Sequence, residues 1–264
     1  MPPYSGRTAL VTGASKGLGE ALSRELAARG AHLVLVARSA DALSRLSEEL
    51  RATHGVRAEV VTADLAAPHG PAEVVAALRE RGREVDLLVN NAGMGAVGPF
   101  LAGSFDRDRR SVDLNITGLM ALTHAIGSRM LERGSGGILN IASSAAFQPM
   151  PYQASYAATK AFVLSFTEAV AEELRTSDIQ VMAAHPGATD TGFFDDTSAT
   201  MAAKAVSPRR VARRILDDFS RGRTISFPGR VSDRVLTFLP RLLRRSTTAR
   251  LAGGFNRRIG HDAA

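Results

Sequence analysis

The sequence has 264 residues, of which 45% are hydrophobic and 22% charged, a composition typical of a globular enzyme with a large buried core. It contains no cysteine, which excludes disulfide bonds, thiolate nucleophiles and cysteine-ligated metals. The net charge is +7, but no motif of nucleic-acid recognition accompanies it, so we expect a solvated basic surface and no nucleic-acid partner. The six histidines lack metal-ligand spacing, so we expect no metal site. The first residues lack a signal-peptide pattern and no apolar run approaches the ~18 residues of a membrane span, which favours a cytoplasmic protein.

A glycine-rich turn lies between the first predicted strand, Thr8–Val11, and a helix predicted from Glu20 to Arg29. Glycines let the backbone approach a pyrophosphate closely, and the N-terminus of the following helix favours negative charge. The spacing is GxxxGxG rather than the commoner GxGxxG, and a tight turn with glycines for packing is the alternative interpretation. The predicted cofactor-binding residues of this turn are Gly13, Ser15, Lys16, Gly17, Leu18 and Gly19.

The second predicted strand, His32–Val36, leads to Arg38, at the position where an NAD site would have a carboxylate for the ribose 2′-hydroxyl. A guanidinium suits the 2′-phosphate of NADP instead, and Lys16 could add a second positive charge. The alternative is that both are solvated basic residues. We therefore predict that the cofactor is NADP(H).

Apolar strands and helices continue to alternate along the chain as far as residue 230. This pattern predicts an α/β fold, a doubly wound parallel sheet with helices on both faces. Ligands of such sheets bind at the carboxyl ends of the strands, and the polar residues that follow these ends are Thr12, Arg38, Asp64, Asn90 and Ser143. The further strands are predicted at residues 58–62, 85–89, 138–142, 179–184 and 224–227, and the further helices at 40–53, 71–81, 105–133, 153–176 and 208–220.

Tyr156 and Lys160 are four residues apart in the helix predicted for residues 153–176, so their side chains share one face. A phenol titrates near ~10, and an ammonium beside it would lower the pKa toward the range that is useful for proton transfer. Ser143, at the end of the strand 138–142, could hydrogen-bond a substrate oxygen, with Ser144 as the alternative. Tyr-x-x-x-Lys alone is a weak signal. Together these residues suit protonation of a carbonyl oxygen or deprotonation of an alcohol.

Over roughly residues 6–230 the sequence resembles the short-chain dehydrogenase/reductase family. The resemblance rests on the order and spacing of TGASKGLG, Asp64-Leu65, Asn-Asn-Ala-Gly, Asn115, Ser143, YAATK and Pro186-Gly187. It implies one Rossmann-type domain of residues 1–230 with seven strands in the order 3-2-1-4-5-6-7. It also implies hydride transfer between NADP(H) and a carbonyl or alcohol, and a homodimer or homotetramer.

The same resemblance assigns roles to single residues. Asp64 would lie at the adenine, Asn90 near the adenine ribose and Gly93 near the nicotinamide. The family's asparagine at the position of Asn115 kinks its helix and holds a water that links the lysine to solvent, although a buried asparagine is also commonly a structural hydrogen-bonder. The catalytic set is Asn115, Ser143, Tyr156 and Lys160, and the cofactor-binding set beyond the first two strands is Asp64, Leu65, Asn91, Ala92, Gly93, Tyr156, Lys160, Pro186, Gly187, Thr189 and Thr191.

The predicted substrate contacts are Ser143, Phe147, Tyr156, Phe193 and Phe194, the last two in a lid that the family places at about residues 187–206. They favour an apolar ketone or ketoacyl-type substrate, although the same residue types occur in ordinary cores.

Residues 231–264 depart from the family pattern, because apolar residues alternate there with arginines and the chain after Gly253 is expected to fray. A basic amphipathic extension packs on its own domain or dimer, or lies on an anionic membrane surface. The alternative functions are a membrane-surface reductase of lipid or sterol carbonyls and, in another class, a non-catalytic NADP(H)-binding sensor.

Overall fold

The computed structural model describes residues 4–191, 205–238, 240 and 242–262. Its centre is a seven-stranded sheet in the order β3-β2-β1-β4-β5-β6-β7, with every neighbouring pair parallel. This confirms the predicted fold class and strand order. The strands are β1 (Thr8–Thr12), β2 (His32–Ala37), β3 (Ala58–Thr62), β4 (Leu87–Asn90), β5 (Gly136–Ile141), β6 (Ile179–Ala184) and β7 (Ile225–Ser226).

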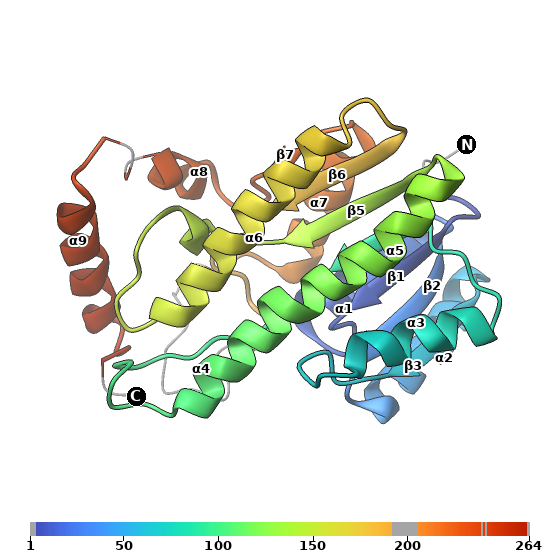
Figure 1. The fold of residues 1–264 in the computed structure, drawn as a ribbon, viewed down its shortest axis with the longest axis horizontal. Helices are drawn as coiled ribbons and strands as arrows, with labels where there is room; N and C mark the ends of the chain where they lie inside the picture. Colours follow the sequence, from blue (N-terminus) through green and yellow to red (C-terminus); the bar gives the residue numbers. More distant parts are fainter. Residues whose placement is uncertain (1–3, 192–204, 239, 241, 263–264) are drawn as a thin grey trace.

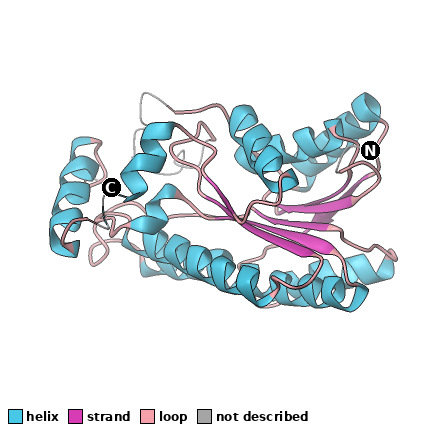
Figure 2. Ribbon diagram, turned by 90° about the horizontal axis from the view of Figure 1, so that it is seen from above, coloured by secondary structure: helices cyan, strands magenta, loops and turns pink. Residues whose placement is uncertain are grey.

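Helices cover both faces of the sheet, as Figures 1 and 2 show. Successive strand residues alternate between two cores: Ala9 and Val11 of β1 belong to one, and Leu10 to the other. Burial on both faces explains why the strands read as continuous apolar runs. The first core includes side chains of α1 (Gly17–Ala28), α2 (Ala40–His54) and α7 (Pro208–Ser220). The second core includes side chains of α3 (Gly70–Glu80) and α5 (Leu119–Arg133), and it packs against α6 (Ala154–Glu173).

The segment predicted as one long helix or a helix pair is a continuous helical run with a π-turn inside it. Helix α4 (Phe105–Val112) passes through the π-helix η1 (Asp113–Gly118) into α5. A Cβ at Gly118 would lie 2.6 Å from the carbonyl oxygen of Leu65, so the helix approaches the loop after β3 too closely for any side chain. π-turns inside α-helices are frequent at functional sites.

The C-terminal part forms two helices, α8 (Val231–Phe238) and α9 (Arg245–Arg258), so the fraying expected after Gly253 was wrong. Helix α9 is held against the loop that precedes α6, because Asn256 Nδ2 donates to the carbonyl oxygen of Pro151 at 2.7 Å. Within the described residues, no helix has the length and apolar character needed to cross a bilayer.

Candidate active site

The end of β1 is tied to the end of β4 by the hydroxyl of Thr12. Its Oγ1 accepts hydrogen bonds from the backbone N–H groups of Asn91 and Ala92 at 3.0 and 2.9 Å. In return, the side-chain amide of Asn91 donates to the carbonyl oxygen of Thr12 at 3.0 Å. The predicted cofactor segments after β1 and β4 therefore form one structure. Thr12, which the sequence places only among the polar residues at the strand ends, connects them.

The glycine-rich turn is closed too tightly for side chains. Gly13 has φ +65°, and a Cβ there would lie 2.9 Å from the Cα of Ala92. A Cβ at Gly19 would lie 2.2 Å from the carbonyl oxygen of Gly13, while Gly17 faces Thr191. The turn leads into the N-terminus of α1, whose N-cap position is the exposed Lys16. Bare backbone at a helix N-terminus is the geometry that accommodates a phosphate group.

Two predicted residues of this turn take different positions. Ser15 remains partly exposed in the turn, whereas the side chain of Leu18 is buried in the core. The first helix begins at Gly17 rather than at Glu20. The late start in the sequence prediction follows from the low helix propensity of glycine.

Arg38 and Asp64 follow neighbouring strands and interact electrostatically. Burial raises the pKa of Asp64, but the Ala66 N–H, the Arg110 guanidinium and the charge of Arg38 lower it more, so the net pKa is below its ordinary value. Asp64 forms an ion pair with Arg110, a partner that sequence reasoning missed. The side chain of Leu65 is buried.

Ser143 stands two residues after the end of β5, at the N-cap of the short 3-10 helix Ser144–Phe147, and Tyr156 stands in the first turn of α6. Ser143 Oγ accepts the N–H of Ala145 at 3.1 Å, so its own proton is available to another acceptor. Burial raises the pKa of Tyr156, and a hydrogen bond with Ser143 opposes the rise. The expected net lowering by Lys160 is therefore wrong for this structure, in which burial dominates.

Lys160 is buried on the same side of α6 as Tyr156. Its Nζ donates to the carbonyl oxygen of Ile141 at 2.8 Å and lies 5.9 Å from the centroid of the Tyr156 ring. Burial lowers the pKa of Lys160 to about 8. Its ammonium can therefore exchange a proton close to neutral pH.

Asn115 lies in the π-turn and is buried. Its Nδ2 donates to the carbonyl oxygen of Met94 at 2.8 Å and to Thr159 Oγ1 at 2.9 Å, and its Oδ1 accepts the Met94 N–H at 3.0 Å. A Cβ at Gly93 would lie 3.3 Å from Asn115 Oδ1 and 3.4 Å from Lys160 Nζ. The structure thus brings Asn115, Gly93 and Lys160 together, and these bonds make Asn115 a clamp between the loop after β4 and α6.

Asn90, in contrast, does not face the cofactor side. Its Nδ2 donates to Thr123 Oγ1 at 3.0 Å and to Asn140 Oδ1 at 2.9 Å inside the core. Asn90 and Asn140 are register partners on β4 and β5, which makes this a structural polar pair. The side chain of Asn90 is thus engaged in the core, and the side chain that meets the glycine-rich turn is that of the neighbouring Asn91.

The Pro186-Gly187 turn lies against Ser144, whose N–H donates to the carbonyl oxygen of Pro186 at 3.0 Å. Thr189 Oγ1 donates to the carbonyl oxygen of Gly187 at 3.0 Å. Together with the approach of Thr191 to Gly17, these contacts bring the predicted nicotinamide segment to Ser144, the neighbour of Ser143, and to the glycine-rich turn.

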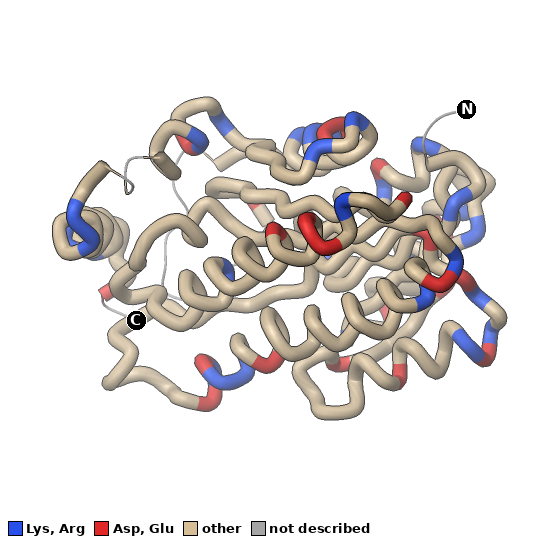
Figure 3. The backbone as a smooth tube through the Cα atoms, turned by 45° about the horizontal axis from the view of Figure 1, so that its top comes forward, with Lys and Arg blue, Asp and Glu red and all other residues tan. Residues whose placement is uncertain are grey.

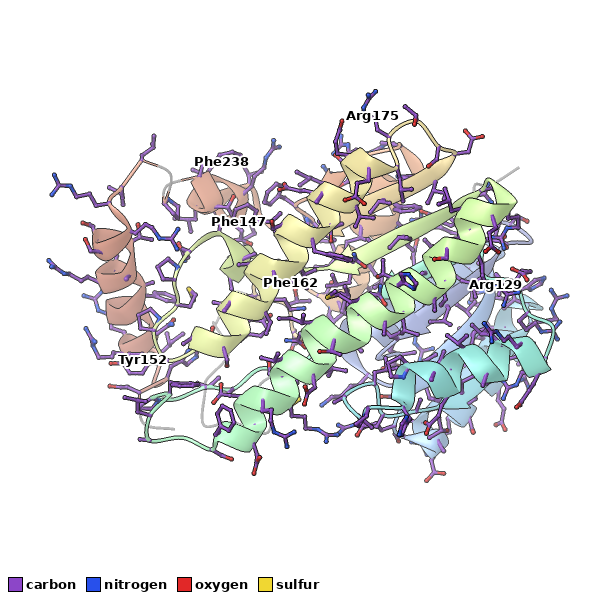
Figure 4. All side chains as sticks on the ribbon, viewed as in Figure 1. Arg129, Phe147, Tyr152, Phe162, Arg175 and Phe238 are labelled. Atoms are coloured by element: carbon purple, nitrogen blue, oxygen red, sulfur yellow. The ribbon has the colours of Figure 1, made fainter. Side chains whose placement is uncertain are left out.

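Phe147 belongs to an aromatic cluster beside Ser143. Its ring centroid lies 4.9 Å from that of His185 and 5.7 Å from that of Phe227, and Figure 4 marks Phe147 on the turn after β5. His185 is buried, and within the described chain neither of its ring nitrogens has a hydrogen-bond partner. Burial lowers its pKa to about 4. Phe193 and Phe194 lie outside the described residues, as does most of the predicted lid.

No cluster of three metal-binding side chains occurs in the described parts of the chain. The site instead combines a glycine cradle, a basic residue after β2, and a serine, tyrosine and lysine that meet at the ends of β5 and α6.

Comparisons with known proteins agree with this geometry. Residues 7–202 match the family described as short chain dehydrogenase. A 3-oxoacyl-[acyl-carrier-protein] reductase from Synechocystis is 35% identical over 200 residues, which cover 75% of this chain and 81% of that protein.

Two solved structures extend the match. A short-chain dehydrogenase from Sphingobium yanoikuyae in complex with NADPH superimposes with a TM-score of 0.81 and 34% identity, covering 90% of this chain and 96% of that one. The bulky-bulky ketone specific alcohol dehydrogenase from Comamonas testosteroni superimposes with a TM-score of 0.77 and 32% identity, covering 91% of this chain and 96% of that one. The chain belongs to the short-chain dehydrogenase/reductase family of oxidoreductases.

Proposed function

We propose that the protein is an NADP(H)-dependent oxidoreductase that reduces the carbonyl of an apolar ketone or ketoacyl-type substrate to an alcohol, or catalyses the reverse reaction. The observation that carries the proposal is the hydrogen bond between Ser143 and Tyr156 with the buried Lys160 on the same helix face. A non-catalytic sensor on this fold would have no need of these three residues together.

The residues around the glycine-rich turn fit a dinucleotide. Gly13, Gly17 and Gly19 leave the turn at the start of α1 without side chains and closely packed, and the exposed Lys16 and Arg38 supply positive charge for a 2′-phosphate. The NADPH complex of the Sphingobium relative supports the same preference. When bound, the nicotinamide supplies or accepts the hydride.

The chain itself supplies the proton and the positioning. We assign Tyr156 Oη as the group that gives a proton to the carbonyl oxygen, or removes one from the alcohol. The Ser143 hydroxyl, whose oxygen accepts the Ala145 N–H, has one proton of its own and would donate it to the same substrate oxygen. Lys160 would bind the nicotinamide ribose and stabilise the phenolate as Tyr156 gives up its proton. Asn115 ties the Met94 backbone to the side chain of Thr159, the residue before Lys160.

The apolar substrate class is supported by the aromatic cluster of Phe147 and by the relatives named for a bulky ketone and a 3-oxoacyl group. We further propose a single catalytic domain of residues 1–230, a homodimer or homotetramer, and a cytoplasmic location. Size measurement by analytical ultracentrifugation tests the oligomer directly.

Replacement of Tyr156 by Phe tests the reaction. The variant is expected to lose roughly 10²–10⁴-fold in turnover of a bulky aromatic ketone or a 3-oxoacyl thioester, because the proton donor is gone, while NADPH binding persists. Tyr152→Phe is the matched control: it removes a phenol oxygen four residues earlier, one that accepts a bond from Arg257 at 3.1 Å. Equal activity of both variants would contradict the assignment of Tyr156.

A further inference from the structure

The C-terminal helices carry almost all of the net charge of the chain. Residues 230–262 contain eight arginines and two aspartates, whereas residues 1–229 contain 25 basic and 24 acidic residues. Six of the seven net positive charges therefore lie in this segment. Its seven described arginines are all exposed. Helix α9 has no acidic residue, and in Figure 3 it carries blue segments.

Exposed apolar side chains accompany these arginines. Val231 and Val235, one helical turn apart on α8, are 80% and 62% exposed, and Leu242 is 83% exposed. Leu251 and Phe255, one turn apart on α9, are 59% and 56% exposed. A surface that alternates arginines with large apolar side chains is unusual for a solvated face, and it has the composition of a helix that lies at a membrane interface.

This surface lies at the catalytic end of the molecule. Figure 1 places α8 and α9 beyond the carboxyl ends of the strands. Asp233 of α8 lies against Gly187, and Asn256 of α9 bonds Pro151, five residues before Tyr156.

A third exposed apolar segment joins the same end. The Gly98 N–H donates to the carbonyl oxygen of Tyr152 at 2.9 Å, next to the point where α9 is attached. The loop that starts there carries Leu101, which is 96% exposed, together with the exposed Phe100 and Phe105.

We propose that α8, α9 and the loop 98–105 form a docking surface for an anionic phospholipid bilayer, with the catalytic end facing the lipid. Charge complementarity selects this occupant. A second copy of the chain in a two-fold arrangement would bring two sets of six excess positive charges together. Nucleic acid would satisfy the arginines but leave the aliphatic side chains in water. Anionic headgroups over acyl chains satisfy both.

The test is flotation of the full-length protein with phosphatidylcholine vesicles, with and without phosphatidylserine. Binding is expected only to the anionic vesicles, and it should weaken when salt rises from about 0.1 M to about 1 M, as the screening length falls from about 10 Å to about 3 Å. No turnover is measured, so the result is independent of the proposed reaction.

Two variants with matched controls locate the surface. Leu251→Glu should weaken vesicle binding roughly tenfold or more through lost apolar burial, while Leu131→Glu, at a leucine 55% exposed near the opposite end of the sheet, should not. Arg245→Gln with Arg258→Gln should weaken binding about fivefold per charge, while the exposed Arg45→Gln with Arg79→Gln should not.

Three outcomes would overturn the proposal. The first is equal binding to neutral and anionic vesicles, or none to either. The second is vesicle binding that Leu251→Glu leaves intact while it converts an oligomer into monomers, which would assign the surface to a second copy. The third is binding of single-stranded DNA, but not of vesicles, through the same arginines.

Discussion

Lys160 Nζ donates a hydrogen bond of 2.8 Å to the carbonyl oxygen of Ile141, so the strand that delivers Ser143 also holds the lysine of α6. The two side chains proposed to be catalytic are thereby both attached to the end of one strand. The arrangement keeps an ammonium buried, which lowers the pKa of Lys160 from 10.5 to about 8.

We predict that Lys160→Met loses turnover without losing stability. The size of the pKa shift indicates that burial of the ammonium destabilises the parent by about 3 kcal/mol at pH 7. The variant avoids this cost but loses about 1–3 kcal/mol with the hydrogen bond to Ile141. Because the pKa is depressed, the parent regains stability as pH rises from about 8 toward 10.5, so the advantage of the variant should shrink there. Urea denaturation at several pH values measures this, and parallel loss of stability and turnover would indicate a structural lysine.

Gly19→Ala should abolish nucleotide binding. Its Cβ would lie 2.2 Å from the carbonyl oxygen of Gly13 and 2.5 Å from Asn91 Nδ2, so the turn or the β1–β4 connection has to move. Gly254→Ala on α9 is the control, because its Cβ meets nothing within 4 Å and alanine favours helix by up to about 1 kcal/mol. NADPH fluorescence titration and thermal unfolding compare them. Intact NADPH binding by Gly19→Ala would show that the turn is not the phosphate cradle.

Arg38→Glu should reverse the cofactor preference. Loss of a charge-assisted bond to the 2′-phosphate costs about tenfold to a hundredfold in NADPH affinity, while NADH affinity should hold or improve. Arg57→Glu is the control, since Arg57 is also exposed but lies at the opposite end of a neighbouring strand. Equal effects of both variants on NADPH affinity would show that Arg38 acts only as a general surface charge.

His185→Phe should make the free energy of unfolding less dependent on pH in the acid range. The folded-state pKa of His185 is about 4 against 6.5 for a free histidine, so the unfolded chain takes up the proton first. Stability from this group is complete above about 6.5 and falls by roughly 3 kcal/mol as pH drops toward 4. The phenylalanine variant, placed among Phe147 and Phe227, should lack that decrease. If the stability of parent and variant depends on pH in the same way below about 6.5, the lowered pKa of His185 is contradicted.

The sheet could be predicted because its strands are short apolar runs separated by helix-length segments, a pattern that local sequence shows directly. The glycine-rich turn, Ser143, Tyr156 and Lys160 were predicted from their spacing together with the strand and helix context and the order of the other family motifs. The direction of a side chain was harder to predict: Asn90 and Asn91 are adjacent and chemically identical, yet one pairs with Asn140 in the core and the other with Thr12.

Other features depend on contacts that the sequence does not show. The π-turn ends at Gly118, which meets the backbone of Leu65, more than fifty residues earlier in the chain. The pKa of Tyr156 depends on how deeply the phenol is buried, which a four-residue spacing to Lys160 cannot indicate. The pairing of Asp64 with Arg110 likewise joins distant segments of the fold.

The hydrogen bonds between Thr12 and Asn91 also have a consequence for folding during synthesis. Residues 12–19 are synthesised early, but their shape depends on Asn91 and Ala92 and on the approach of Thr191. Contacts between such distant segments form slowly, because long loops have to close first. A nascent chain that ends before β4 therefore contains every glycine of the turn but lacks its contacts with Asn91, Ala92 and Thr191, so we expect cofactor affinity only once most of the chain has left the ribosome.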